Sequence, residues 1–304
     1  MGHEHHHGAA IGHARTRHRW RLAAALALVG AFLGVELAVG LLSGSLALLS
    51  DAGHMAADAV TLVTALVATR VAGRSEPTGR RTYGSYRAEV FASGFAVLVM
   101  LGVAVSIVSE AVERLDRTAV EIATGPMMVV GGIGLCVNIA AMLLLRSGAS
   151  ESLNVKGAYL EVVADTAGSV GVVVAAALVA ATGMALWDTL VAVAIGCFVV
   201  VRAVGLGRQV WDVLAQHAPA GIDPRAVSAD LASIEGVQEV HDVHLWTLTS
   251  GMHVATVHLV TDDLARGHAV LDRARQLLRD RHGIAHATLQ VEPADHTGCH
   301  ELGW

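Results

Sequence analysis

Long apolar runs constrain this 304-residue chain more than any other feature of its sequence. Runs of about 20 residues recur six times, and that is the length at which an α-helix crosses the hydrocarbon core of a bilayer. We expect spans at approximately 21–42, 48–70, 88–112, 124–145, 157–182 and 186–206. Hydrophobic residues make up 54% of the chain and charged residues only 16%, a balance that soluble domains of this size rarely reach. The sequence therefore predicts a multi-pass membrane α-helical protein.

Positively charged residues are distributed unevenly among the segments that flank and join these runs. Residues 15–21, before the first run, hold four arginines, and residues 70–87 hold five. The short turns at 43–47 and 183–186 hold no lysine or arginine. Cytoplasmic loops carry the excess of these residues, so we expect both termini to lie in the cytoplasm. The first run lacks the short apolar region and cleavage site of a signal peptide, and we expect it to be retained as a span.

The sequence changes character after Arg208, where the apolar runs give way to a soluble pattern. A turn-rich segment at 219–224 opens this part of the chain. We expect a helix at about 224–234, strands at 239–248 and 252–261, a helix at about 264–282 and a strand at 286–292. This α-β-β-α-β order predicts a small α+β domain of the ferredoxin-like or metallochaperone-like type, with helices on one face of its sheet.

Together these features predict a chain of four parts, with six transmembrane helices followed by a small α+β cytoplasmic domain. The parts are a His-rich cytoplasmic tail at 1–20, a transmembrane domain at 21–208, a cytoplasmic domain at 209–293 and a second tail at 294–304. The first tail contains His3, His5, His6 and His7. That composition favours weak metal capture, and a dispensable tail is the alternative.

Two pairs of ionisable residues lie within the apolar runs. His54 and Asp58 are in the second run and Glu161 and Asp165 in the fifth, and each pair is spaced i, i+4. That spacing places both members of a pair on one helix face. Ionisable groups inside a bilayer are costly, so by default they indicate a functional site that faces the bundle interior. One imidazole and three carboxylates suit the tetrahedral coordination of a divalent metal such as Zn²⁺.

Other interpretations of these residues are weighed against the metal site. The pairs could form interhelical hydrogen bonds or line a water-filled cavity. An intramembrane metalloprotease would need H-E-x-x-H within a span, and no expected span contains it. The sequence also has no G-x-x-x-x-G-K-[ST] nucleotide loop and no basic patch with interleaved aromatics. We therefore expect a carrier driven by an ion gradient, with no enzymatic activity, no prosthetic group and no nucleic-acid partner.

Four segments carry a resemblance to a known family. They are SLALLSDAGHM at 45–55, LNVKGAYLEVVAD at 153–165, VHDVHLW at 240–246 and HATLQVE at 286–292. The first two resemble the second- and fifth-helix signatures of the cation diffusion facilitators, and the last two resemble the C-terminal domain of that family. The similarity spans nearly the whole chain and is closest to the bacterial zinc-exporter branch.

The resemblance implies a homodimeric antiporter in the bacterial inner membrane that exports Zn²⁺, with Cd²⁺ or Co²⁺ as further cargo, by alternating access in exchange for protons. It gives transport-site roles to His54, Asp58 and Asp165. Position 161 departs from the pattern, because the zinc-selective branch usually has His there and this chain has Glu161. An extra carboxylate makes the site harder and shifts its relative preference toward Mn²⁺, Fe²⁺ or Co²⁺. Zn²⁺ is the expected cargo, and a Mn²⁺ or Fe²⁺ preference is the alternative.

Histidines are unusually dense in the expected cytoplasmic domain. The resemblance implies a second metal site there, built from His241, His258, His286 and Glu292, with Zn²⁺ as a regulatory ligand. Asp242 or Asp295 could substitute for one ligand, and the tail with Cys299 and His300 could reach the site. Polar, solvent-facing strand positions are the alternative explanation of these histidines. The alternative class of function is a membrane-anchored metal sensor, in which the helices only anchor this domain.

Overall fold

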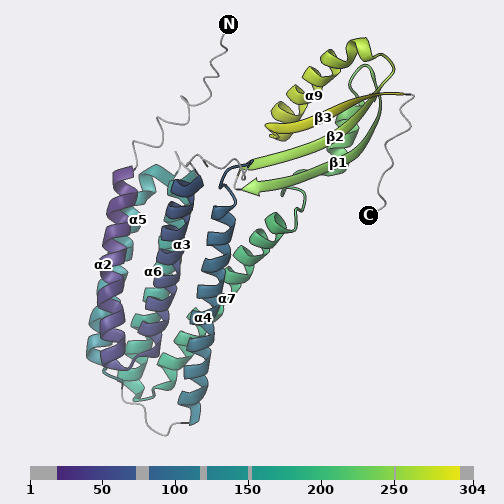
Figure 1. Cartoon of the computed structure of the whole chain (residues 1–304). Coiled ribbons are helices and arrows are strands. Elements are labelled where there is room, and N and C mark those ends of the chain that lie inside the picture. Colours follow the sequence, from purple (N-terminus) through teal and green to yellow (C-terminus); the bar gives the residue numbers. More distant parts are fainter. Residues whose placement is uncertain (1–18, 73–81, 117–121, 150–152, 250, 295–304) are drawn as a thin grey trace. The chain divides into compact units, whose positions relative to one another are not determined.

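Six long helices come first in the part of the chain that the structure describes (Figure 1). The computed structural model describes residues 19–72, 82–116, 122–149, 153–249 and 251–294. The helices are α2 (Arg19–Ser43), α3 (Leu46–Ala72), α4 (Ala88–Asp116), α5 (Thr124–Ala149), α6 (Leu153–Thr182) and α7 (Leu186–Leu214). Among the residues whose side chains are described, α4, α5, α6 and α7 hold apolar stretches long enough to cross a membrane, and α2 holds a shorter one. The predicted membrane α-helical fold is confirmed.

The chain divides into two compact units. The first contains residues 1–63 and 96–204, and the second contains residues 64–95 and 205–304. Most of the six long helices therefore belong to the first unit, and the α+β domain belongs to the second. The His-rich tract at the N-terminus and the expected tail with Asp295, Cys299 and His300 lie outside the described residues.

Small residues let the helices of the first unit approach closely. Helix α5 packs against both α2 and α6. A Cβ added at Gly134 of α5 would lie 2.6 Å from the ring of Phe32, and one added at Gly131 would lie 3.0 Å from Val172. In a membrane the lipid tails are as apolar as the side chains, so the hydrophobic effect does not drive helices together. Close van der Waals packing of this kind drives their association instead.

The outward faces of the same helices are apolar. Leu98 and Val105 on α4, Leu143 on α5 and Val201 on α7 are each more than 60% exposed. Side chains of this type, exposed in rows on long helices, suit contact with lipid tails rather than with water. The helices thus present apolar side chains outward, whereas Glu36, Asp51, His54, Asp165 and Asp188 are buried.

The start of α3 is held by a carboxylate from α7. Asp188 is fully buried and accepts hydrogen bonds from Ser45 Oγ at 2.6 Å, from the Leu46 backbone N–H at 2.7 Å and from the Ala47 N–H at 3.2 Å. Arg114 of α4 donates to the same carboxylate at 3.3 Å. The first backbone N–H groups of a helix have no partner within the helix, and an anion there satisfies them. Asp188 therefore fixes the beginning of the helix that carries His54 and Asp58.

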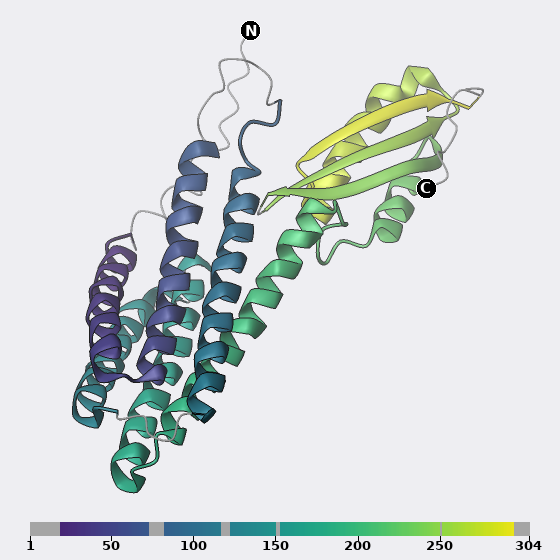
Figure 2. The same cartoon turned by 60° about the horizontal axis from the view of Figure 1, so that its bottom comes forward.

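The second unit contains the expected small α+β domain (Figure 2). Its elements are α8 (Pro224–Ala232), β1 (Val237–Thr249), β2 (Met252–Thr261), the 3-10 turn η1 (Leu264–Arg266), α9 (Gly267–His282) and β3 (His286–Pro293). The sheet order is β1-β2-β3, with β1 and β2 antiparallel and β2 and β3 parallel. The α-β-β-α-β order predicted from the sequence is confirmed.

Both helices of this domain cover one face of the sheet. Leu231 of α8 and Leu278 of α9 are fully buried in one core with Val257 and Leu259 of β2. Alternate residues of a strand point to opposite faces, so His258, which lies between these two β2 residues, belongs to the other face. The face away from the helices is therefore where polar strand residues can gather.

Candidate metal-binding sites

Three of the four expected intramembrane ligands lie together. His54 and Asp58 of α3 and Asp165 of α6 each offer a ligand atom, and these atoms are within 4.8 Å of one another. His54 Nε2 lies 3.3 Å from Asp165 Oδ1 and 3.7 Å from Asp58 Oδ2. The His54 side chain is only 2% exposed. One nitrogen and two carboxylates thus converge in the interior of the first unit.

The hydrogen bonding of this cluster leaves room for a cation. Among the described residues, His54 Nδ1 and Asp165 Oδ1 are buried without a hydrogen-bond partner, and the contact of this oxygen with His54 Nε2 at 3.3 Å is an ion-pair contact. An orphaned polar atom in a buried site costs free energy unless a ligand completes it. The donor set and the orphaned oxygen both fit a divalent metal as a bound substrate.

Glu161 does not join the three-residue cluster. Its Oε1 forms an ion pair with Arg202 Nη2 of α7. Arg202 also donates from Nη1 to Asp58 Oδ2 at 3.2 Å and lies 3.4 Å from His54 Nε2. The structure therefore places a guanidinium where the sequence led us to expect a fourth ligand.

Arg202 is a site residue that the sequence analysis missed. The available signal was its position inside the expected span at 186–206, because an ionisable residue within a span indicates a functional site by default. Nothing in the sequence indicates which carboxylates it contacts, because Asp58 is 144 positions away and Glu161 is 41 positions away.

A second group of buried polar residues adjoins the metal cluster, and the sequence analysis did not assign it. Glu36 of α2 and Asp51 of α3 are each 1% exposed. Ser169 Oγ donates to Asp51 Oδ2 at 3.5 Å, and Asn138 Nδ2 donates to Ser169 Oγ at 3.1 Å. Gly168 packs so closely that an added Cβ would lie 2.5 Å from Asp51 Oδ1. Asp51 thereby extends the polar face of α3 to one turn before His54.

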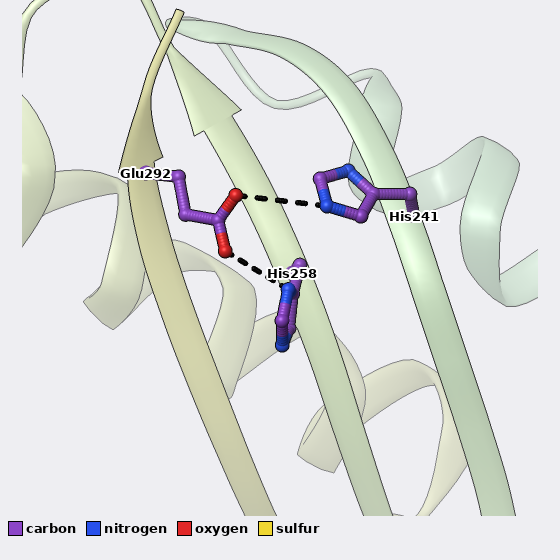
Figure 3. Close-up of side chains that lie close together, drawn as sticks. All are labelled: His241, His258 and Glu292. Carbon is purple, nitrogen blue, oxygen red and sulfur yellow. Dashed lines mark ion pairs between the residues drawn. The ribbon is translucent and has the colours of Figure 1, made fainter. Parts of the chain in front are cut away.

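The cluster expected in the α+β domain contains three of its four expected residues (Figure 3). His241 of β1, His258 of β2 and Glu292 of β3 come from three neighbouring strands. Glu292 Oε1 lies 2.9 Å from His258 Nδ1, and its Oε2 lies 3.6 Å from His241 Nε2. Two imidazoles and a carboxylate at these distances are a typical partial ligand set for Zn²⁺.

The structure places His286 apart from this cluster. It pairs with Val254 at the start of β3, whereas His258 pairs with Gln290 four residues further along. At about 3.3 Å per residue, that offset amounts to roughly 13 Å along the strand. His286 is therefore not close enough to share a metal ion with His258.

A β-bulge places Asp242 beside His258 instead. The register runs from the His241–His258 pair to the His244–Thr256 pair, so β1 uses one more residue than β2. Asp242 occupies this bulge with φ = 50°, in the left-handed region that Asp tolerates better than most residues. Its Oδ2 lies 3.6 Å from His258 Nε2, and its Oδ1 lies 2.8 Å from His244 Nε2. The expectation that Asp242 could supply a ligand thus has a structural basis.

Two family models together match nearly the whole chain. Residues 22–215 match the cation efflux transmembrane domain, and residues 219–294 match the cation efflux protein, cytoplasmic domain. The cation efflux system protein CzcD of Alcaligenes sp. (strain CT14) is 42% identical over 295 residues, covering 97% of this chain and 91% of that protein. The zinc transporter ZitB of Escherichia coli (strain K12) is 35% identical over 284 residues, covering 92% of this chain and 90% of that protein.

Two further relatives are similar. The cadmium, cobalt and zinc/H(+)-K(+) antiporter of Bacillus subtilis (strain 168) is 31% identical over 301 residues, covering 97% of this chain and 93% of that protein. A solved metal-bound C-terminal domain of the CzcD transporter is 38% identical and covers 23% of this chain and 99% of that chain, with a TM-score of 0.22. The resemblance to cation diffusion facilitators is therefore confirmed, and the chain belongs to the cation efflux family of multi-pass membrane transporters, which are not enzymes.

Proposed function

We propose that this divalent cation efflux protein exports Zn²⁺ from the cytoplasm by alternating access, in exchange for protons. The observation that carries the proposal is the buried cluster of His54, Asp58 and Asp165, which joins two helices of the transmembrane domain. Zn²⁺ accepts imidazole nitrogen and carboxylate oxygen ligands, and a set of three protein ligands keeps a position for another ligand. Relatives named for zinc, and for cadmium, cobalt and zinc, support this class of cargo.

Proton exchange follows from the chemistry of the same ligands. A metal binds the deprotonated carboxylate and the neutral imidazole, so metal binding releases protons and proton binding releases the metal. A relative named as an antiporter for H⁺ and K⁺ supports cation exchange of this kind. We therefore assign the exchanged protons to the ligands of the transport site.

The two alternatives to zinc export predict different behaviour. A Mn²⁺ or Fe²⁺ carrier would need Glu161 as a metal ligand to make the site harder, whereas Glu161 is paired with Arg202. A membrane-anchored sensor would not need buried ionisable residues within its helices, and His54 and Asp165 are both buried. The structure thus favours a Zn²⁺-type carrier over either alternative.

Reconstituted flux tests this function directly. In proteoliposomes with a zinc dye and a pH dye, Asp58→Ala and Asp165→Ala should each lower Zn²⁺ flux at least about 100-fold, because each removes a metal ligand. The control is Asp212→Ala, which removes an exposed carboxylate from α7 and should leave the flux unchanged. Mn²⁺ flux above Zn²⁺ flux would contradict the zinc assignment, and flux without proton movement would contradict the exchange.

We further propose that the cytoplasmic domain binds Zn²⁺ as a regulatory ligand and that the protein works as a homodimer in the bacterial plasma membrane with both termini in the cytoplasm. The cluster of His241, His258 and Glu292 supports the regulatory site, and Asp242 is its candidate fourth ligand. The match to the family's cytoplasmic domain and the bacterial relatives support the assembly and the location.

A further inference from the structure

We propose that Arg202 is a tethered counter-cation of the transport site. In this role it competes with the metal for Asp58 and keeps Glu161 out of the metal's ligand set. The proposal rests on the transport function proposed above, and it assigns a role in that function to a residue of α7. It follows from four contacts around one guanidinium group.

The first contacts place Arg202 on an atom that the metal needs. Asp58 Oδ2 accepts a hydrogen bond from Arg202 Nη1 at 3.2 Å, and the same oxygen lies 3.7 Å from His54 Nε2. Arg202 Nη1 is itself 3.4 Å from His54 Nε2. A metal bound between these two ligand atoms would stand directly beside the guanidinium, and two cations at such a distance repel strongly in a buried site. A metal bound to Asp58 Oδ2 would therefore compete with Arg202 for the same oxygen.

The ion pair with Glu161 uses the second terminal nitrogen of the guanidinium, Nη2. Arg202 Nη2 pairs with Glu161 Oε1 while Nη1 holds Asp58. The planar fork of an arginine can bind two carboxylates at once, which the single ammonium of a lysine cannot do in the same geometry. Glu161 lies one turn before Asp165 on α6, yet its side chain is 36% exposed and that of Asp165 is 7% exposed. Arg202 thus holds Glu161 at the more exposed side of the cluster.

Phe198 fixes the position of this guanidinium. Its ring centroid lies 5.9 Å from Arg202 Cζ and 5.8 Å from the His54 ring, which it meets edge to face. Phe198 precedes Arg202 by one helical turn, so both side chains project from one face of α7. Contact with an aromatic ring adds to the attraction of a cation in a partly buried place.

The charge of the cluster explains what such a residue does during transport. Asp58, Glu161 and Asp165 carry three negative charges when ionised, and Arg202 cancels one of them. The remaining two charges equal the charge of one divalent ion. A carrier must also return to its starting conformation without its cargo, and in that state its carboxylates have no metal ion beside them. A guanidinium paired with Asp58 lowers the free-energy cost of these buried negative charges. Arg202 therefore weakens metal binding and speeds release.

The test measures binding and transport separately on the purified full-length protein. Arg202→Gln should lower the Kd for Zn²⁺ about tenfold or more, because it removes a competing cation. It should also lower KM and kcat together, since release becomes slower. Arg202→Lys keeps the positive charge and should lie between the wild type and Arg202→Gln. The control is Arg208→Gln, which removes an exposed arginine from the same helix and should change neither value.

A double variant tests the pairing with Glu161. In Glu161→Gln/Arg202→Gln the net charge of the cluster equals that of the wild type, so the Kd should return toward the wild-type value. Zn²⁺ affinity that falls or stays unchanged in Arg202→Gln, while Asp58→Ala still abolishes flux, would overturn the role of Arg202 alone. Undiminished flux in Asp58→Ala would instead overturn the transport site itself.

Discussion

A tightly packed carboxylate, Asp51, lies in the interior of the transmembrane domain. Asp51 is buried beside Gly168 of α6, and no larger residue fits there without moving the carboxylate. Its other oxygen accepts from Ser169, whose hydroxyl is held by Asn138. Because Asp51 precedes His54 by three residues on α3, any displacement of Asp51 reaches the metal cluster through one helical turn.

Substitution of Gly168 tests this contact at the residue scale. In Gly168→Ala the added methyl group would meet Asp51 Oδ1 at 2.5 Å, and overpacking of this kind costs about 1–3 kcal/mol. We expect a lower thermal midpoint in detergent and reduced Zn²⁺ flux. The control is Gly102→Ala on α4, where an added Cβ meets no atom within 4 Å. Equal effects of the two substitutions would show that the close approach to Asp51 is unimportant.

At the scale of the elements, α3 is held by polar contacts from α6 and α7. Asp188 of α7 caps its first turn, and Ser50 Oγ donates to the Ala192 carbonyl of α7 at 3.1 Å. The ionisable residues of α3 then face Asp165 of α6 and Arg202 of α7. Helix α3 is thus positioned by α7 at its start and by both α6 and α7 along its polar face.

Removal of the cap should loosen this element. Asp188→Ala leaves the N–H groups of Leu46 and Ala47 without their acceptor, and each unsatisfied buried group costs about 1–3 kcal/mol. Ser45→Ala removes only one of the bonds to Asp188 and should cost less. Hydrogen exchange of the first turn of α3 should rise more in Asp188→Ala than in Ser45→Ala. Similar protection in both variants would show that Asp188 does not fix the helix start.

At the scale of the whole molecule, the described residues of each compact unit hold one candidate metal site. His54, Asp58 and Asp165 belong to the first unit, and the three strand residues of the cytoplasmic cluster belong to the second. Separate units allow the two sites to be lost independently. The metal content of the full-length protein should therefore respond separately to substitutions in each site.

Zinc stoichiometry checks this independence. His241→Ala/His258→Ala should lower bound Zn²⁺ from about two ions to about one per chain while leaving measurable flux, because the transport ligands stay intact. His286→Ala is the matched control, since His286 lies on the same sheet but away from the cluster, and it should change neither quantity. Complete loss of flux in the double variant would instead make the cytoplasmic site part of the transport step.

Local sequence patterns predicted the membrane helices, the α-β-β-α-β domain and the position of His54 and Asp58 on one face of a helix. These features follow from local periodicity: apolar runs of span length, alternation along strands and i, i+4 spacing on a helix. The same local rule failed to predict the pairing of Glu161, because spacing along α6 says nothing about a guanidinium brought by α7. The predicted domain boundaries stay predictions.

Contacts between residues far apart in the sequence could not be predicted from local patterns. The cap of α3 joins positions 142 residues apart, and Arg202 reaches Asp58 across 144 positions. Strand register, rather than the density of histidines, separated His286 from the cluster of His241, His258 and Glu292. A left-handed residue in a β-bulge placed Asp242 beside His258. Local preferences fix the elements of this protein, whereas long-range packing and register decide which charges share a site.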